Sequence, residues 1–436
     1  MKIGLGKIYW KVLLIIQCLF IFSTFGITHK LFIKKETQMS PIYPKLYANS
    51  LRNNFTTIET KALGKECWRI LRNKSEISSP SYLLASIVAI YSISTNQISA
   101  INTENGNIIW SCKKWPNSPV VLYNDLMYYQ SIKEEDKLEA VNILTGKKSE
   151  KIINLHFVNE KQKLIFFEPQ KSYFIAACFS PSTEILNEKG IVEKISPDFV
   201  LYAESYENKG FKWMYSENND KSSNYSEPNN NQGIIWIVED ENSILYHIIV
   251  PNKNQIFLGT ETELLLYDAN SASYEAKAIR SFKYPLKRVF NLCADDLGNL
   301  YFIGSNGKDN IDVLLMCNDK GNIIWKWEKP DIANTQFSIM AITAKGEIVV
   351  ADSSTVYCVA KGSPVWQYST GHYTPKYITT TADGSILIAA ENMLFLCKDG
   401  KKIFSFDAGT TIVAPPVVDA QGCIYLLTMT HIIKLK

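Results

Sequence analysis

The chain has 436 residues, of which 46% are apolar and 20% charged, the balance of a globular protein with one large core or several domains. Its 46 basic and 43 acidic residues leave a net charge of only +3. Because no basic run is interleaved with aromatic side chains, nucleic acid is excluded as an expected partner. The five histidines are scattered without metal-ligand spacing, so no metal site is predicted from them.

The N-terminal region predicts a membrane anchor. Residues 1–11 are a short basic segment, and residues 12–28 carry no charged side chain, a length at the short end for a membrane-spanning helix. A cleaved signal peptide is the alternative, but this run is longer than a typical signal core and no clean small-residue cleavage site follows it. We favour a single-pass anchor in the cell membrane, a spacer over residues 29–60, and an exported, extracytoplasmic domain behind them.

The cysteines favour structural roles. Cys18 lies within the predicted anchor after Gln17, where a lipidated cysteine would follow a small residue, so lipidation is not predicted. The other eight stand singly in apolar, strand-like runs, and no CxxC occurs. This spacing indicates neither zinc nor thioredoxin-type chemistry and predicts buried thiols.

Beyond residue 60 the chain repeats a glycine followed four residues later by a large aromatic residue. The pairs are Gly64–Trp68, Gly106–Trp110, Gly321–Trp325, Gly362–Trp366 and Gly400–Phe404. Gly146 keeps the glycine and loses the aromatic residue. The steps between successive glycines are about 40 residues, which is the period of a β-propeller blade.

A second glycine turn precedes each of the later repeats. It lies in residues 294–304, 343–352, 381–390 and 419–428, and an apolar strand follows it each time. The unit is therefore four strands, with fourth strands opening near positions 64, 106, 146, 210, about 272, 321, 362 and 400. We predict an all-β, eight-bladed β-propeller over residues 61–436. Seven blades is the alternative, because the repeat spacing lengthens between residues 146 and 321 and the blades there are harder to count.

The ends of the repeat region predict how the ring closes. Residues 64–70 read as a fourth strand with no three before it, and the last unit reads as three strands with no fourth. Pairing the first strand with the last sheet would complete that sheet and remove an exposed edge.

The repeat resembles that of the pyrroloquinoline-quinone-type propellers. The stretches "ISAINTENGNIIW" (98–110) and "LEAVNILTGKK" (138–148) are similar to that family's apolar strand, turn, Thr-Gly-Lys and Trp, and "SPVV" (118–121) and "PPVVDAQGCIY" (415–425) are similar to its inner-strand start. The resemblance implies a propeller over nearly all of the chain after residue 60. The same repeat builds quinoprotein alcohol dehydrogenases and non-enzymatic proteins of the outer-membrane-protein assembly lipoprotein B type.

The repeated aromatic residues are predicted to pack between blades. A ligand platform is the alternative for Trp68, Trp110, Trp325, Trp366 and Phe404, but a single binding site would not recur in every blade. Full burial of such a ring removes about 150–250 Å² from water. Asn102, Asn142 and Asp268 are expected to open the turn between the last two strands by accepting backbone N–H groups.

No catalytic, cofactor-binding or metal-binding residue is predicted. The resemblance implies that a quinoprotein enzyme would carry two adjacent cysteines, Glu and Asn calcium ligands and an Asp base, and no Cys-Cys dipeptide occurs here. His372 could face the channel mouth, although a lone histidine is more often structural or exposed. The polar stretch 216–233 reads as a solvated insertion or as a partner-binding loop.

The function that we expect is therefore a membrane-anchored, non-catalytic scaffold without a cofactor. Its partner would be a protein at the membrane or cell envelope. A quinoprotein-type dehydrogenase and a sensor that binds a small ligand in the central channel are the alternatives.

Overall fold

The computed structural model describes the compact unit that begins at Pro41, from Phe55 onward. Backbone and side chains are described for most of residues 55–150 and 286–436, and only the backbone of individual strands for most of residues 153–283. The predicted basic segment, anchor and most of the spacer, and the stretch 216–233, lie outside the described residues. Within the described part, no helix is long and apolar enough to cross a membrane.

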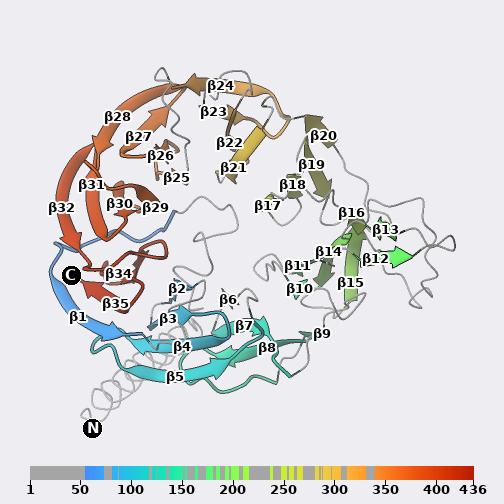
Figure 1. Cartoon of the computed structure of the whole chain (residues 1–436), viewed down its shortest axis with the longest axis horizontal. Coiled ribbons are helices and arrows are strands. Elements are labelled where there is room, and N and C mark those ends of the chain that lie inside the picture. Colours follow the sequence, from blue (N-terminus) through green and yellow to red (C-terminus); the bar gives the residue numbers. More distant parts are fainter. Residues whose placement is uncertain are drawn as a thin grey trace, which may run out of the picture. The chain divides into compact units, whose positions relative to one another are not determined.

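The described chain is all-β, as predicted, and most of it is built from four-stranded antiparallel sheets whose strand order follows the chain (Figure 1). These sheets comprise β2–β5 (Tyr82–Ala85, Ala89–Ile93, Gln97–Asn102 and Ile108–Lys113), β6–β9 (Val120–Tyr123, Leu126–Gln130, Lys137–Asn142 and Ile153–Asn154), β17–β20 (His247–Asn252, Gln255–Gly259, Glu263–Asp268 and Arg280–Lys283), β21–β24 (Arg288–Ala294, Leu300–Ser305, Asp312–Cys317 and Ile323–Glu328), β25–β28 (Ile339–Ile342, Ile348–Ala351, Thr355–Ala360 and Ser363–Ser369) and β29–β32 (Pro375–Thr380, Ser385–Ala390, Met393–Lys398 and Lys401–Asp407).

The middle of the chain departs from this pattern. Strands β10 (Lys163–Leu164), β11 (Tyr173–Phe179), β14 (Asp198–Ser205) and β15 (Gly210–Tyr215) pair in that order, and β16 (Trp236–Val238) also pairs with β14. A separate hairpin, β12 (Thr183–Leu186) with β13 (Val192–Ile195), lies between β11 and β14 in the sequence. The fourth strand predicted near residue 272 was placed too early, because β20 begins at Arg280.

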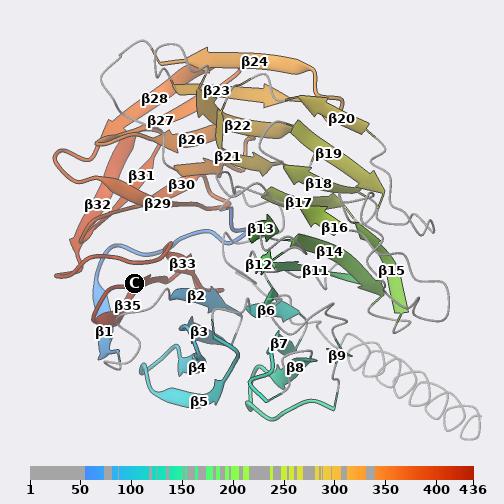
Figure 2. The same ribbon diagram turned by 45° about the vertical axis from the view of Figure 1, so that its right-hand side comes forward.

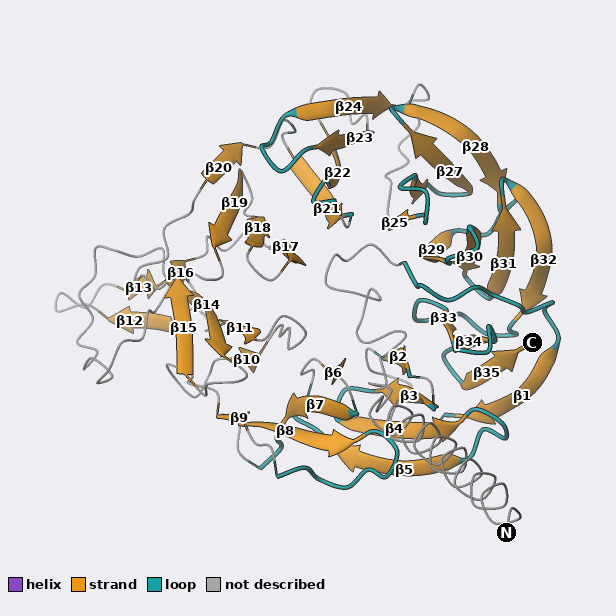
Figure 3. Ribbon diagram, turned by 180° about the vertical axis from the view of Figure 1, so that it is seen from behind, coloured by secondary structure: helices purple, strands orange, loops and turns teal. Residues whose placement is uncertain are grey.

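One sheet joins the two ends of the described chain. Strand β1 (Glu66–Leu71) pairs antiparallel with β35 (His431–Leu435), followed in order by β34 (Ile424–Leu427) and β33 (Val417–Val418). Figure 3 shows β1 beside β35 from behind. The lone strand that the sequence predicted at residues 64–70 therefore pairs with the C-terminal strands.

The strand positions within a sheet differ in burial. The second strands β3, β7, β22, β26, β30 and β34 are buried along their whole length, which explains their unbroken apolar sequences. The fourth strands β5, β28 and β32 instead alternate exposed and half-buried residues towards their ends. In Figure 2, β24, β28 and β32 follow one another as the last strands of successive sheets.

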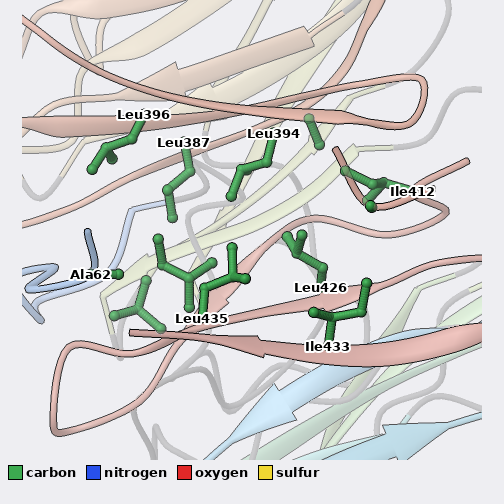
Figure 4. Packing of buried hydrophobic residues seen from close by; sticks show 12 residues of the cluster. Ala62, Leu387, Leu394, Leu396, Ile412, Leu426, Ile433 and Leu435 are labelled. Carbon is green, nitrogen blue, oxygen red and sulfur yellow. The ribbon is translucent and has the colours of Figure 1, made fainter. Parts of the chain in front are cut away.

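The first strands of neighbouring sheets contact each other. Strand β17 contacts β21, β21 contacts β25, β25 contacts β29, and β33 contacts β2. The hydrophobic core lies between such neighbours, and Figure 4 shows one part of it, where Leu387, Leu394 and Leu396 of one sheet face Leu426, Ile433 and Leu435 of the next. Each sheet therefore buries its faces against adjacent sheets, the packing of propeller blades.

Candidate functional site

Each repeated aromatic residue packs against the repeated glycine of the next unit. A Cβ atom at Gly146 would be 2.6 Å from the ring of Trp110. The same ring contact joins Trp68 to Gly106 at 3.2 Å, Trp366 to Gly400 at 3.3 Å, and Phe404 to Gly64 at 2.7 Å. At Gly362 the nearest side-chain atom is the Cβ of Trp325, at 3.4 Å. We call these five pairs the aromatic–glycine junctions. They confirm that the repeat aromatics pack between units, and they show why glycine recurs with them.

The junction glycines are needed for a second reason. Gly146 has φ of 66° and Gly400 has φ of 74°, a backbone region that disfavours side chains. The indole groups add hydrogen bonds across the junction, since Trp68 Nε1 donates to the Thr103 carbonyl and Trp110 Nε1 to the Ile143 carbonyl, both at 3.1 Å. The five rings are half-buried, so the area expected for full burial was too large.

A β-bulge precedes every junction ring, a feature that the sequence analysis missed. Trp110 pairs with Ala100 and Ile108 with Ile101, which leaves Ile109 as the extra residue. The same shift occurs at Cys67, Ile324, Val365 and Ile403. A bulge bends and twists an edge strand and hinders pairing with a foreign strand.

The asparagine turns are confirmed where they are described. Asn102 Oδ1 accepts the N–H groups of Glu104 and Asn105 at 2.8 and 3.3 Å. Asn142 Oδ1 accepts the corresponding N–H groups of Leu144 and Thr145, both at 3.1 Å. The side chain of Asp268 lies outside the described residues.

The antiparallel order gives each sheet two ends. Turns between the first and second strands and between the third and fourth lie at one end, which we call the upper face. Loops between the second and third strands, and connections from one sheet to the next, lie at the other end, which we call the lower face.

The lower-face loops are tied to the residue four positions after four of the five junction rings. The backbone N–H groups of Arg72, Lys114, Thr370 and Ala408 donate to carbonyl groups of Thr430, Asn96, Ser354 and Asn392 in the loops of their own sheets. Side chains add to this link: Arg72 Nη1 donates to the Thr428 carbonyl at 2.7 Å. Lys114 Nζ donates to the Thr95 carbonyl at 2.8 Å.

Lys114 is the most deeply buried of these cations. Its side chain is 1% exposed, and burial lowers the pKa of its ammonium to about 8. Its ammonium is held by the carbonyl groups of Thr95 and Trp115. Lys114 therefore has a structural role, because its two acceptors belong to two lower-face loops that it links.

Lys329 occupies the same repeat position and links two sheets. It forms an ion pair with Asp352, whose carboxylate also accepts the hydroxyl of Tyr357 at 3.2 Å. Burial by itself would raise the pKa of Asp352, but the hydrogen bonds from Lys329 and from the backbone N–H groups of Ser354 and Thr355 hold it below the ordinary value of 3.8. The same ion pair raises the pKa of Lys329 despite its burial.

Two buried carboxylates support upper-face turns. Asp419 is 1% exposed and accepts the hydroxyl of Tyr425 at 2.7 Å together with the N–H groups of Gln421 and Cys423. Asp295 accepts the hydroxyl of Tyr301 at 2.8 Å in the corresponding turn. Burial, with the neighbouring carboxylate, raises the pKa of each tyrosine. These carboxylates thus serve local structure.

The lower face exposes three large apolar side chains within the described part. Leu71 is 75% exposed at the end of β1, and Met429 and Ile132 are each 44% exposed in loops. Leu71 and Met429 flank the Arg72 link, because Arg72 Nη1 also donates to the Met429 carbonyl at 3.3 Å. These side chains stand on loops that are fixed by hydrogen bonds. The lower face is therefore the candidate site for binding another molecule.

The other predicted positions are dispersed. His372 is exposed on a lower-face connection, with its ring tilted by 35° against that of Tyr373 at a centroid distance of 4.0 Å. Cys293, Cys317, Cys358, Cys397 and Cys423 are buried as predicted, and no disulfide joins the described cysteines. The prediction was wrong for Cys67, which is exposed because it is the bulge residue of an outer strand. In the described part of the chain, no group of His, Cys, Asp and Glu side chains could hold a metal ion.

Comparisons with known proteins identify the fold. No protein-family model matches the chain, and no curated protein matches its sequence. Among solved structures, a quinohemoprotein alcohol dehydrogenase from Pseudomonas putida is similar to 90% of this chain over 80% of its own, with a TM-score of 0.55 and 8% identity. A europium-containing methanol dehydrogenase is similar to 91% of this chain over 90% of its own, with a TM-score of 0.50 and 11% identity.

BamB from Moraxella catarrhalis is similar to 85% of this chain over 97% of its own, with a TM-score of 0.48 and 10% identity. The fold is that of the quinoprotein-type β-propellers, as the repeat predicted.

Proposed function

We propose that this chain is a membrane-anchored, non-catalytic β-propeller that binds a protein partner at the cell envelope through its lower face. The observation that carries the proposal is the exposure of Leu71, Ile132 and Met429 on loops fixed by buried links such as Arg72. Apolar side chains on a rigid support bind a partner with little loss of conformational entropy. Arg72 holds the loop that carries Met429, and Lys114 and Lys329 fix other loops of the lower face.

The propeller in this proposal is a closed ring of eight blades. The pairing of β1 with β35 supports closure, and so does the Phe404–Gly64 junction, which repeats the contact made between other neighbouring units. The order β10, β11, β14 and β15 supports one further blade in the middle of the chain. Closure would leave no sheet edge between the first and last units.

Residues 12–28 are the anchor in this proposal, with the propeller on the extracytoplasmic side. Support comes from the absence of charge in that run and from the large domain that follows a first apolar segment.

Photo-crosslinking from the lower face tests the partner. A photoreactive phenylalanine analogue would replace Leu71, Ile132 or Met429, one at a time, in the full chain in its native membranes. Ser405, exposed in the outer strand β32, is the matched control position. We expect the same discrete protein adduct from the lower-face positions and none from Ser405. Equal adducts from all positions, or none from any, would contradict the proposed binding face.

A quinoprotein-type dehydrogenase is the second candidate, because the fold is shared with two alcohol-oxidising enzymes. That likeness concerns the fold alone. Such an enzyme would bind pyrroloquinoline quinone and Ca²⁺, so a cofactor titration separates the two functions.

A further inference from the structure

The upper face carries a lysine beside nearly every repeat glycine. Gly106 is the exception, because asparagines flank it. The exposed lysines next to the other five glycines are Lys65, Lys147, Lys320, Lys361 and Lys401. They lie at the turn that leads into each fourth strand, so the turns place separate positive charges along one face.

Exposed aliphatic side chains accompany these lysines. The bulge residues Ile109, Ile324, Val365 and Ile403 lie near the upper end of their strands and are each about half exposed. Leu63 and Leu297, on the same face, are 80% and 87% exposed. Most of the exposed large aliphatic residues in the described part therefore lie towards the upper face.

Acidic side chains on this face are fewer. The exposed ones among the described residues are Glu59, Glu66, Glu104, Asp125, Asp319 and Asp399. Glu66 is paired with Arg69 at 2.8 Å, which reduces its field. Lys61, Lys402 and Lys436 are further exposed lysines on this face. Lys148, Lys345 and Lys398 are exposed there too, but each is paired with a carboxylate, of Glu139, Asp399 and Asp383 respectively. Among the exposed side chains described on this face, lysines therefore outnumber carboxylates, and the carboxylates of Asp295 and Asp419 are buried beneath it.

The chain also enters the propeller on this face. Thr56 N–H donates to the Thr380 carbonyl and Lys61 N–H to the Gly422 carbonyl, both at 3.0 Å, so residues 56–61 lie across the upper turns of two sheets. The described chain therefore begins on the upper face, and the uncharged run 12–28 precedes it in the sequence.

We propose that the upper face docks onto an anionic lipid surface. Its lysines would meet the phosphate groups, and its exposed aliphatic side chains would enter the boundary between headgroups and acyl chains. An acidic protein would attract the same lysines. A lipid surface is favoured because the exposed aliphatic side chains accompany the lysines, which matches headgroup phosphates beside acyl chains, and because the described chain begins on this face after the uncharged run 12–28.

This inference rests on the membrane attachment in the proposed function and adds which face meets the membrane. It leaves the lower face, with Leu71, Ile132 and Met429, directed towards a partner.

The test uses the full chain in vesicles of phosphatidylcholine, with or without phosphatidylglycerol, that contain a photoactivatable phospholipid. Mass spectrometry would map the labelled peptides. With phosphatidylglycerol at low salt, we expect label on peptides that contain Leu63, Ile109 or Ile403, and none on those with Ile132 or Met429. Without phosphatidylglycerol, or at high salt, the upper-face label should fall about tenfold because the attraction is screened.

A charge reversal supplies the second arm. The triple variant Lys65→Glu, Lys147→Glu, Lys401→Glu should reduce upper-face labelling about tenfold or more without changing the unfolding midpoint. The matched control is Lys113→Glu, Lys133→Glu, Lys376→Glu, which changes as many exposed lysines away from the upper face and should leave labelling unchanged.

Equal labelling of both faces, or labelling that ignores the upper-face reversal, would overturn the proposal. So would a discrete acidic protein crosslinked at the same positions in native membranes, which would assign the face to a protein. Release of the chain from vesicles by carbonate would instead contradict the anchor of the proposed function. Carbonate release tests the anchor, whereas the lipid label in anionic vesicles tests which face meets the membrane, so the two proposals can fail independently.

Discussion

The junction between Gly146 and Trp110 illustrates how one residue fixes the distance between two units. A methyl group at Gly146 would meet ring atoms of Trp110 at 2.6 to 2.9 Å. Either the ring must move or the units must separate, because neither contact distance is tolerated by packed atoms.

We predict that Gly146→Ala lowers the free energy of unfolding by about 1–3 kcal/mol more than Gly346→Ala does. Both glycines have positive φ, 66° and 75°, but a Cβ at Gly346 would have nothing within 4 Å. The control therefore carries the backbone cost alone. Urea unfolding of both variants measures the difference, and equal losses would show that the junction tolerates a side chain.

The ion pair between Lys329 and Asp352 makes stability depend on pH in acid. Because the folded pKa of Asp352 lies below its ordinary 3.8, the carboxylate stabilises the fold above about pH 3.8, and this contribution is lost as the pH falls through the folded pKa. Asp352→Asn should cost about 3 kcal/mol at pH 7, because Lys329 is left with an uncompensated charge. The cost should shrink below pH 3.8.

Thermal unfolding at several pH values measures this effect. The matched control is Asp399→Asn, whose carboxylate is 70% exposed and 3.9 Å from Lys345, and which should cost less than about 0.5 kcal/mol. If Asp352→Asn cost the same at every pH, the pair would not be the source of the acid dependence.

At the scale of the element, Trp110 makes two interactions across its junction that substitutions can separate. The ring fills the space above the next glycine, and the indole N–H donates to the Ile143 carbonyl at 3.1 Å. Phe404 occupies the same position without a donor, which shows that the packing part alone is tolerated.

Trp110→Phe should therefore cost about 1 kcal/mol, the value of one hydrogen bond, whereas Trp110→Ala should cost about 3 kcal/mol through lost packing. Chemical denaturation of the two variants gives both numbers. Equal costs would mean that the hydrogen bond, and not the ring, joins the units.

The sequence predicted these elements unevenly. The glycine and the aromatic residue recur at fixed spacing, so the strands, the asparagine turns and the packing role of Trp110 could be read locally. The partner of Trp110 lies in the next unit, 36 residues on at Gly146, and spacing within one unit does not show it. The bulge at Ile109 was hidden because it only shifts the pairing register. Lys329 and Asp352 meet across two sheets with no shared local motif.

The candidate site was predicted less well than the fold. Leu71, Ile132 and Met429 are single apolar residues in different segments, and only the loop geometry brings them to the lower face. Lys65, Lys147 and Lys401 could have been noticed beside the repeat glycines. Their common face, however, depends on which end of each sheet the turns occupy.

At the scale of the whole molecule, the proposed ring closure depends on β1. Deletion of residues 1–72 would remove β1 and the Trp68 and Gly64 junctions and leave the edge of β35 unpaired. We predict self-association and a lower unfolding midpoint, because an exposed apolar edge strand pairs with other chains. Deletion of residues 1–54 is the control, and it should leave the chain monomeric with an unchanged unfolding midpoint. Size-exclusion chromatography measures the outcome, and a monomeric, equally stable 73–436 chain would contradict closure.

The most direct test of the non-catalytic account is a titration of the full chain with pyrroloquinoline quinone and Ca²⁺, with thermal unfolding and dye-linked alcohol oxidation as readouts. A bound cofactor at 100 times its Kd would add about 2.7 kcal/mol of stability. The account predicts no shift of the midpoint and no turnover. A saturable rise of the midpoint together with alcohol oxidation would contradict it and assign the chain to the dehydrogenases whose fold it shares.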